Sequence, residues 1–251
     1  MTSSPLPGTP SDEVESVLAF GRCVVDFAYT SMSTRHPEGR DLEYLHWHCF
    51  DHRPEQFRLE EIRAAFRLVS TPECRAARAA SAPRYDAIDF VMNYLFAAPA
   101  AMQPFYGLGA TLREVGRLPE LLPSVEQALY AIAGRVADPT IKVGADVLPW
   151  WPARGMYLMI EQGSVPAADL VEVHGVAGAW WAGAAVDIAP EHSRAPTDHQ
   201  LTYLFLDDDP VAVAKRLRPV LEQRWAASGA TGLLAAPFHF VDALDLARHL
   251  P

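Results

Sequence analysis

One order of predicted secondary-structure elements occurs twice along the 251-residue chain. Runs of β-branched and aromatic residues predict strands, and apolar residues spaced three and four positions apart predict helices. In the first half, strand, helix, strand, strand, helix and strand are expected at 17–29, 37–57, 62–71, 85–97, 100–117 and 125–136. In the second half, the same order is expected at 155–161, 165–174, 176–186, 201–207, 211–226 and 233–241. This β-α-β-β-α-β order is that of the ferredoxin-like unit.

Duplication of such a unit has a physical reason. A single four-stranded sheet with helices on one face leaves its other face in water, so we expect two sheets to pack face to face and bury both apolar faces. The sequence therefore predicts an α+β fold of two tandem ferredoxin-like halves. The expected parts are a disordered lead-in at 1–13, the first half at 14–140, a linker at 141–152 and the second half at 153–251. Within the last strand, Pro237 is expected only at an edge or a bulge.

Charge and composition exclude several classes of protein. The chain has 21 basic and 31 acidic residues, a net charge of −10 and no run of basic side chains, so no nucleic-acid partner is expected. No apolar stretch approaches the ~18–20 residues that cross a membrane. The N-terminus lacks the cationic start and apolar segment of a secretory signal, and the three cysteines form no CxxC pair. We therefore expect a cytoplasmic protein without membrane association.

The segment at the end of the first predicted helix carries a recognisable motif. Trp47, Asp51, His52, Pro54 and Glu55 are spaced as in the W-x-x-x-[ED]-H-x-P-E pattern of the dimeric α+β barrel superfamily, near its EthD-like branch. Arg67 matches the arginine of that family's next strand. The second half lacks this signature. The chain thus resembles a dimeric α+β barrel whose two subunits are joined as an internal pseudo-dimer, and the resemblance implies one well-formed site, in the first half.

Members of this superfamily include polyketide cyclases, muconolactone isomerases, cofactor-free monooxygenases and haem enzymes, and the fold does not choose among them. The sequence has no GxSxG, P-loop, GxGxxG or CxxC motif. We expect a cofactor-independent lyase, cyclase or isomerase that moves a proton on a small hydrophobic, aromatic or polyketide-like substrate. A cofactor-free or haem-dependent oxygenase and a non-catalytic ligand-binding protein are the alternatives. The expected assembly is a monomer, with its internal pseudo-dimer, or a homodimer.

Three residues are expected to carry proton transfer. On a helical wheel, His46 falls within the apolar stripe that includes Leu45 and Cys49, so it is expected to face the gap between helix and sheet. A neutral imidazole there could act as acid or base, or it could be a core residue bonded to a backbone carbonyl. His52 or Asp26 is expected to orient His46 or share its proton, although His52 could also cap the helix.

Five further residues are expected to contact substrate. Arg22 and Asp26 alternate onto one face of the first predicted strand, and Asp89 and Asn93 share a face of the third. A structural ion pair between these strands is the simpler interpretation, and a polar contact to a substrate oxygen is the alternative. The expected substrate-binding residues are Arg22, Trp47, Asn93, Tyr29 and Asp89.

His48 and His52 are four residues apart on the predicted helix, a spacing that can place two nitrogens on one metal ion. No local third ligand is specified, so a hydrogen-bonded or solvated pair is the alternative interpretation. We expect neither a metal nor a cofactor.

Overall fold

A computed structural model describes residues 6–185, 187, 189 and 193–251. Eight long strands form a closed antiparallel barrel in the order β2-β4-β1-β5-β7-β8-β6-β9, and β9 pairs back to β2. The strands of the first half are β1 (Phe27–Ser33), β2 (Ile62–Val69), β4 (Phe90–Phe96) and β5 (Ser124–Ala137). Those of the second half are β6 (Gly155–Gln162), β7 (Val176–Ala184), β8 (His199–Leu206) and β9 (Thr231–Phe240). The short β3 (Ala80–Ser81) pairs with β9.

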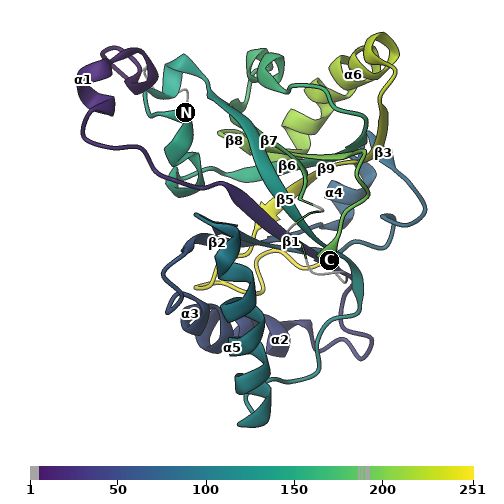
Figure 1. The fold of residues 1–251 in the computed structure, drawn as a ribbon. Coiled ribbons are helices and arrows are strands. Elements are labelled where there is room, and N and C mark those ends of the chain that lie inside the picture. Colours follow the sequence, from purple (N-terminus) through teal and green to yellow (C-terminus); the bar gives the residue numbers. More distant parts are fainter. Residues whose placement is uncertain (1–5, 186, 188, 190–192) are drawn as a thin grey trace.

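Helices cover the outside of the barrel. In the first half, α2 (Asp41–Trp47), the π-helical turn η2 (His48–His52) and α3 (Arg53–Gln56) are continuous, and α5 (Met102–Glu114) lies beside them. In the second half, α6 (Pro210–Ser228) is the single long helix. Figure 1 shows α2, α3 and α5 at one end of the molecule and α6 at the other.

The remaining helical elements are short. They are η1 (Ser11–Glu13), α1 (Glu15–Leu18), α4 (Pro72–Ala76), η3 (Pro99–Ala101), η4 (Pro139–Ile141), η5 (Ala145–Trp150) and η6 (Ala168–Glu172). No helix in the described part of the chain has both the length and the apolar character needed to cross a membrane.

The two halves repeat the same strand order. Numbered within each half, the strands lie in the order 4-1-3-2, as β5-β1-β4-β2 in the first half and β9-β6-β8-β7 in the second. This is the ferredoxin-like arrangement, so the predicted α+β fold with two tandem ferredoxin-like halves is confirmed.

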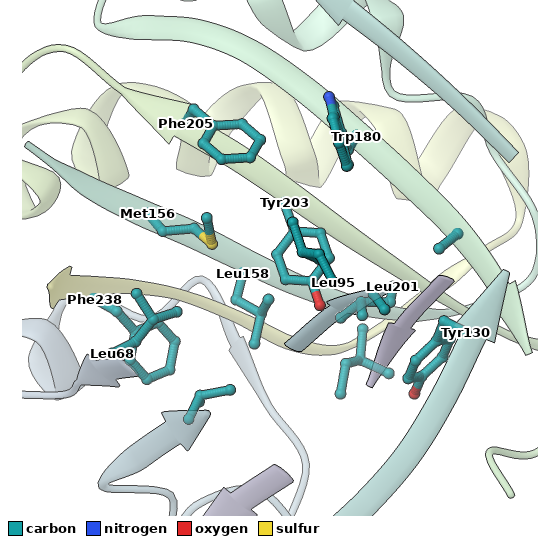
Figure 2. Packing of buried hydrophobic residues seen from close by; sticks show 14 of the residues in the cluster. Leu68, Leu95, Tyr130, Met156, Leu158, Trp180, Leu201, Tyr203, Phe205 and Phe238 are labelled. Carbon is teal, nitrogen blue, oxygen red and sulfur yellow. The ribbon is translucent and has the colours of Figure 1, made fainter. Parts of the chain in front are cut away.

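The expectation of two separate sheets is wrong in one respect, because the sheets join at both edges. Strand β5 pairs with β7 along much of its length, and β2 pairs with β9 through Leu68↔Phe240 and Val69↔His239. Edge strands expose unpaired backbone N–H and C=O groups, and closing the barrel satisfies them. The inner faces of both sheets form one apolar core, and Figure 2 shows Leu68, Leu95, Met156, Trp180 and Tyr203 among the residues gathered there.

Three elements differ most from the sequence prediction. Residues 15–18 form a helical turn, Gly21 takes a φ of +134° after it, and the first strand begins at Phe27 rather than at 17. The predicted strand at 85–97 begins at Phe90. The helix expected at 165–174 is only the short turn η6, which is long enough to connect β6 to β7.

Pro237 lies at a local edge, as predicted. On one side it is opposite Tyr157 of β6. On the other side, β9 pairs with β3 up to Ala235 and resumes pairing with β2 at His239, so Pro237 falls between the two partners. A residue without an N–H donor is tolerated at such a place.

Candidate active site

A cavity of about 460 Å³ lies between the first-half sheet and the helices that cover it. The sheet contributes residues from β1, β2, β4 and β5, and the helical side comprises α2, η2, α3 and α5 with the segment after α5. Its lining residues are Tyr29, Ser31, Tyr44, Trp47, His48, His52, Gln56, Arg67, Met92, Tyr94, Phe105, Tyr106, Gly109, Ala110, Arg113, Leu118, Leu121 and Gln127.

The equivalent space in the second half is filled. There, Val213, Leu217 and Leu221 of α6 pack directly on Tyr157 and Leu204 of the sheet in a fully buried apolar cluster. In the first half, the apolar contacts of α5 are made mainly by Met102 and Phe105 near its start, and the rest of the space stays open. The space between helices and sheet therefore opens into a cavity in the half that carries the motif.

Strand alternation explains which sheet residues line this cavity. On β1, Tyr29 and Ser31 point outward, while Ala28 and Met32 belong to the barrel core. On β2, Arg67 faces the cavity between two neighbours, Phe66 and Leu68, that pack in the barrel. On β4, Tyr94 likewise faces the cavity, while its neighbours Asn93 and Leu95 point into the barrel.

Helical spacing explains the helical side. At ~100° per residue, His48 and His52 fall on the same face as the buried Asp41, Leu45 and Gln56, and the π-helical turn at 48–52 continues directly from α2. His48 is therefore buried and His52 is partly buried, and both line the cavity. Their ring centroids are 5.8 Å apart.

Both imidazoles make specific contacts. The Nε2 atom of His48 lies 3.3 Å from the hydroxyl of Tyr94, and the Nε2 atom of His52 lies 3.0 Å from the Nε2 amide of Gln56. The Trp47 indole stacks on the His52 ring at a centroid distance of 4.8 Å, and its Nε1 donates to the carbonyl of Arg117 at 2.8 Å.

Burial keeps both histidines neutral. Desolvation, with the Arg67 guanidinium as the next contribution, holds the pKa of His48 well below its usual value of 6.5. The same two causes lower the pKa of His52 to about 4. Burial also raises the pKa of the Tyr29 and Tyr94 hydroxyls, so both remain protonated. The site therefore offers neutral proton acceptors at neutral pH.

Several buried polar atoms around the cavity have no hydrogen-bond partner. They are Nδ1 of His48, Nδ1 of His52, Oε1 of Gln56 and Nε of Arg67. Buried polar atoms in folded proteins are nearly always paired, with protein, water or ligand. Four of the buried polar atoms without a partner thus lie around this cavity, and others lie elsewhere, among them Nδ2 of Asn93, Nε of Arg78 and the Tyr157 hydroxyl.

The structure brings together some of the predicted site residues. His52, Trp47 and Tyr29 line the cavity, as does His48. Tyr29 donates from its hydroxyl to Oε1 of Gln127 at 2.9 Å.

Two of the predicted substrate-binding residues lie elsewhere. Asn93 is buried on the barrel side of β4, where its Oδ1 accepts from Thr30 at 3.1 Å and from the Tyr203 hydroxyl at 2.9 Å. Asp89 is buried in an ion pair with Arg75 and accepts from the backbone N–H of Arg35 at 2.7 Å. Both contacts are structural, so the expectation that these two residues face substrate is wrong.

The expected placement of three more residues is also wrong. His46 is exposed and packs on Phe50 at 4.9 Å between ring centroids. The prediction oriented the helical wheel by apolar residues that prove exposed, Leu42 and Phe50 among them, and this turned His46 toward the sheet. Arg22 and Asp26 are exposed because the segment before Phe27 alternates with Val25 in the barrel core, which leaves Arg22, Val24 and Asp26 on the face in water.

Sequence reasoning missed three residues of this cavity. Tyr94 was detectable, because alternation on its strand places it on the face opposite Asn93. Arg67 entered only through the motif resemblance, without a role. Gln56 lies four residues after His52 on the same helical stretch, so helical spacing could have placed it beside His52.

The His48–His52 pair lacks the surroundings of a metal site. Among the described residues, no group of three or more His, Cys, Asp or Glu side chains could hold a metal ion.

A second crevice, of about 500 Å³, lies at the end of β9 near the C-terminus. Its lining includes Asp209 and Asp242 beside Arg248, and the rings of His239 and His249 stack there at 4.0 Å. None of its described lining residues has a buried polar atom without a partner. The cavity in the first half is therefore the stronger candidate.

Comparison with solved structures identifies the fold. A protein provisionally described as a chlorite dismutase superposes with a TM-score of 0.53 at 13% identity, over 89% of this chain and 98% of that one. The chain has the dimeric α+β barrel fold.

Two other solved structures resemble this dimeric α+β barrel more weakly. They are a haem-binding protein from Thermus thermophilus (TM-score 0.48, 10% identity, 88% and 93% of the two chains) and an anthrone oxidase-like protein (TM-score 0.42, 11% identity, 88% and 94%). No protein-family model matches the chain, and no curated protein matches it either.

Haem enzymes occur in the superfamily that the motif resembles, and a histidine nitrogen within reach of the iron is one common way in which a protein holds haem. Here, the Nδ1 atoms of His48 and His52 are shielded, and each Nε2 is already hydrogen-bonded. Gln56, itself buried, lies at Nε2 of His52, where the wide porphyrin ring would have to lie. These residues, as arranged, do not fit haem.

Proposed function

We propose that this protein is a cofactor-independent enzyme that removes a proton from a small, flat, aromatic substrate bound in the first-half cavity. The observation that carries the proposal is the pair of neutral imidazoles, His48 and His52, in a cavity walled by aromatic side chains. A neutral imidazole accepts a proton, and a dry aromatic site strengthens the electrostatic interactions that stabilise the resulting anion.

His52 is the proton acceptor in this proposal. It is the less buried of the two histidines, and its Nε2 is held only by the amide of Gln56. The substrate C–H or O–H takes the place of that amide, and such hydrogen bonds often form only in the substrate complex. Trp47, stacked on the ring, fixes the plane of the imidazole.

His48 and Arg67 have supporting roles. His48 contacts the Tyr94 hydroxyl, and both side chains line the cavity. The centroid of the His48 ring lies 5.8 Å from that of His52. Arg67 supplies positive charge beside the anion that forms when the substrate loses its proton.

The fate of the anion defines the reaction class. The anion could rearrange, as in a cyclase or isomerase, or react with dioxygen, as in a cofactor-free oxygenase. The oxygenase alternative is consistent with the kinds of protein named among the solved structures of similar fold. Assembly as a monomer or homodimer and a cytoplasmic location remain predictions from the sequence.

Hydrogen exchange tests the proton transfer without knowledge of the product. The probe is 2-tetralone, whose C1–H lies between a carbonyl and an aromatic ring, and NMR follows deuterium uptake in D2O. We expect the wild-type protein to accelerate exchange and His52→Gln to lower the acceleration by ~100-fold or more. His46→Gln, an exposed histidine on the same helical stretch, is the matched control and should behave as wild type.

Four outcomes would change the proposal. Equal acceleration by His52→Gln and wild type would remove His52 as the base. Binding of the probe without any acceleration would favour a ligand-binding protein. Oxygen consumption during turnover would assign the oxygenase alternative, and a Soret band in the purified protein would contradict the cofactor-free proposal.

A further inference from the structure

Arg67 carries a buried charge without a counter-ion among the described residues. It is 4% exposed, and its side chain forms no ion pair with any described Asp or Glu. Its protein contacts are a hydrogen bond from Nη2 to the Tyr44 hydroxyl at 3.3 Å and a position over the Tyr44 ring at 5.1 Å. Its Nε–H has no acceptor.

A buried arginine elsewhere in the protein shows the contrast. Arg224, 8% exposed, pairs with Glu161 at 3.4 Å and Asp169 at 3.2 Å and donates to two backbone carbonyls. That arrangement is the usual one, because a buried charge is costly unless it is paired and hydrogen-bonded. Arg67 is left without such compensation.

The cavity around Arg67 is electropositive. None of its described lining residues is Asp or Glu, although the chain as a whole carries a net charge of −10. A second arginine, Arg113 of α5, also lines it. The remaining walls are largely aromatic, including Tyr94, Phe105 and Tyr106.

We infer that the ligand of this cavity is an aromatic carboxylate whose carboxylate group pairs with Arg67. The inference deepens the proposed function, because it names the substrate class of the same site. A planar guanidinium matches the geometry of a carboxylate, and one deeply buried cation balances one negative charge. The aromatic body lies against the tyrosine and phenylalanine rings, and Arg113 favours a second acidic group toward α5.

Binding of matched probes tests the inference. The probes are 2-naphthoate and its neutral analogue 2-naphthamide, with benzoate and anthracene-2-carboxylate to vary the size, and calorimetry gives each Kd. For the probe that fits best, we expect the wild-type protein to bind the carboxylate roughly 10- to 100-fold more tightly than its amide, the range for a hydrogen bond to a charged group.

Variants identify the residue responsible. Arg67→Gln should remove the preference for the carboxylate, and Arg67→Lys should keep part of it. Arg63→Gln, an exposed arginine on the same strand and outside the cavity, should leave it unchanged. Thermal unfolding of Arg67→Met without ligand should give a Tm equal to or above that of wild type, because the substitution removes a buried charge that lacks a counter-ion.

Several results would overturn the inference. They are equal Kd values for carboxylate and amide, a preference that survives in Arg67→Gln, or failure of every carboxylate to bind the wild type. His52→Gln separates this inference from the proposed function, because it should abolish proton exchange and still bind the carboxylate. Exchange that depends on His52, without any carboxylate preference, would refute only the inference about Arg67.

Discussion

The pKa of His52 predicts how the stability of the protein depends on pH. The folded protein lowers this pKa from 6.5 to about 4, so the unfolded chain binds a proton at this position more readily than the folded one. Stability from neutral His52 is therefore fully present above pH 6.5 and declines as the pH falls toward 4. Integrated over that window, the difference corresponds to ~3 kcal/mol of unfolding free energy.

Urea unfolding at several pH values between 7 and 4 measures this effect. Between pH 6.5 and 4, His52→Gln should lose ~3 kcal/mol less stability than the wild type, because glutamine does not titrate. His46→Gln should follow the wild-type curve, since His46 is exposed. Parallel curves for wild type and His52→Gln would show that His52 is solvated, and the argument from burial would fail. The rate of proton exchange should fall toward pH 4 for the same reason, as His52 gains its proton.

Three other substitutions test the packing that supports the site. Glu161→Gln should lower the free energy of unfolding by about 1–3 kcal/mol, because it removes the buried counter-ion of Arg224 and leaves the exposed Asp169 as its partner, whereas the exposed Glu43→Gln should lower it by less than about 1 kcal/mol. Gly134→Ala should lower the free energy of unfolding by ~1–3 kcal/mol, because the added Cβ would overlap the Trp181 ring. Gly183→Ala, on the neighbouring strand, should leave it nearly unchanged, because no atom lies within 4 Å of the added Cβ. Tyr94→Phe should lower stability by ~1 kcal/mol and slow proton exchange, because it removes the hydroxyl that contacts Nε2 of His48.

The fold was largely predictable because its signals are local. Apolar periodicity and turn residues located most of the strands and all three long helical regions, and their order indicated the ferredoxin-like unit twice. Joining of the sheets was not predictable in the same way. The pairing of β2 with β9 brings Leu68 beside Phe240, and no local pattern indicates which edges meet across such a separation.

The site was predicted less well, because it depends on side-chain direction. The motif found the correct segment, with Trp47 and His52, but an ideal helical wheel turned His46 inward instead of His48. The wheel was oriented by Leu42 and Phe50, which are exposed, whereas the polar Asp41 and Gln56 are buried, so residue polarity pointed to the wrong face. Similarly, Arg22 and Asp26 do share a face, but that face is exposed, and the alternation of polar and apolar residues does not say which face meets a substrate.

The central claim is that the first-half cavity, and not the crevice near the C-terminus, binds the ligand. Side-chain ¹⁵N NMR of histidine-labelled protein during titration with 2-naphthoate tests it directly. We expect the signals of His48 and His52 to shift with saturation, while those of His239 and His249, which line the other crevice, stay in place. Shifts of His239 and His249 with unchanged His48 and His52 would contradict the account.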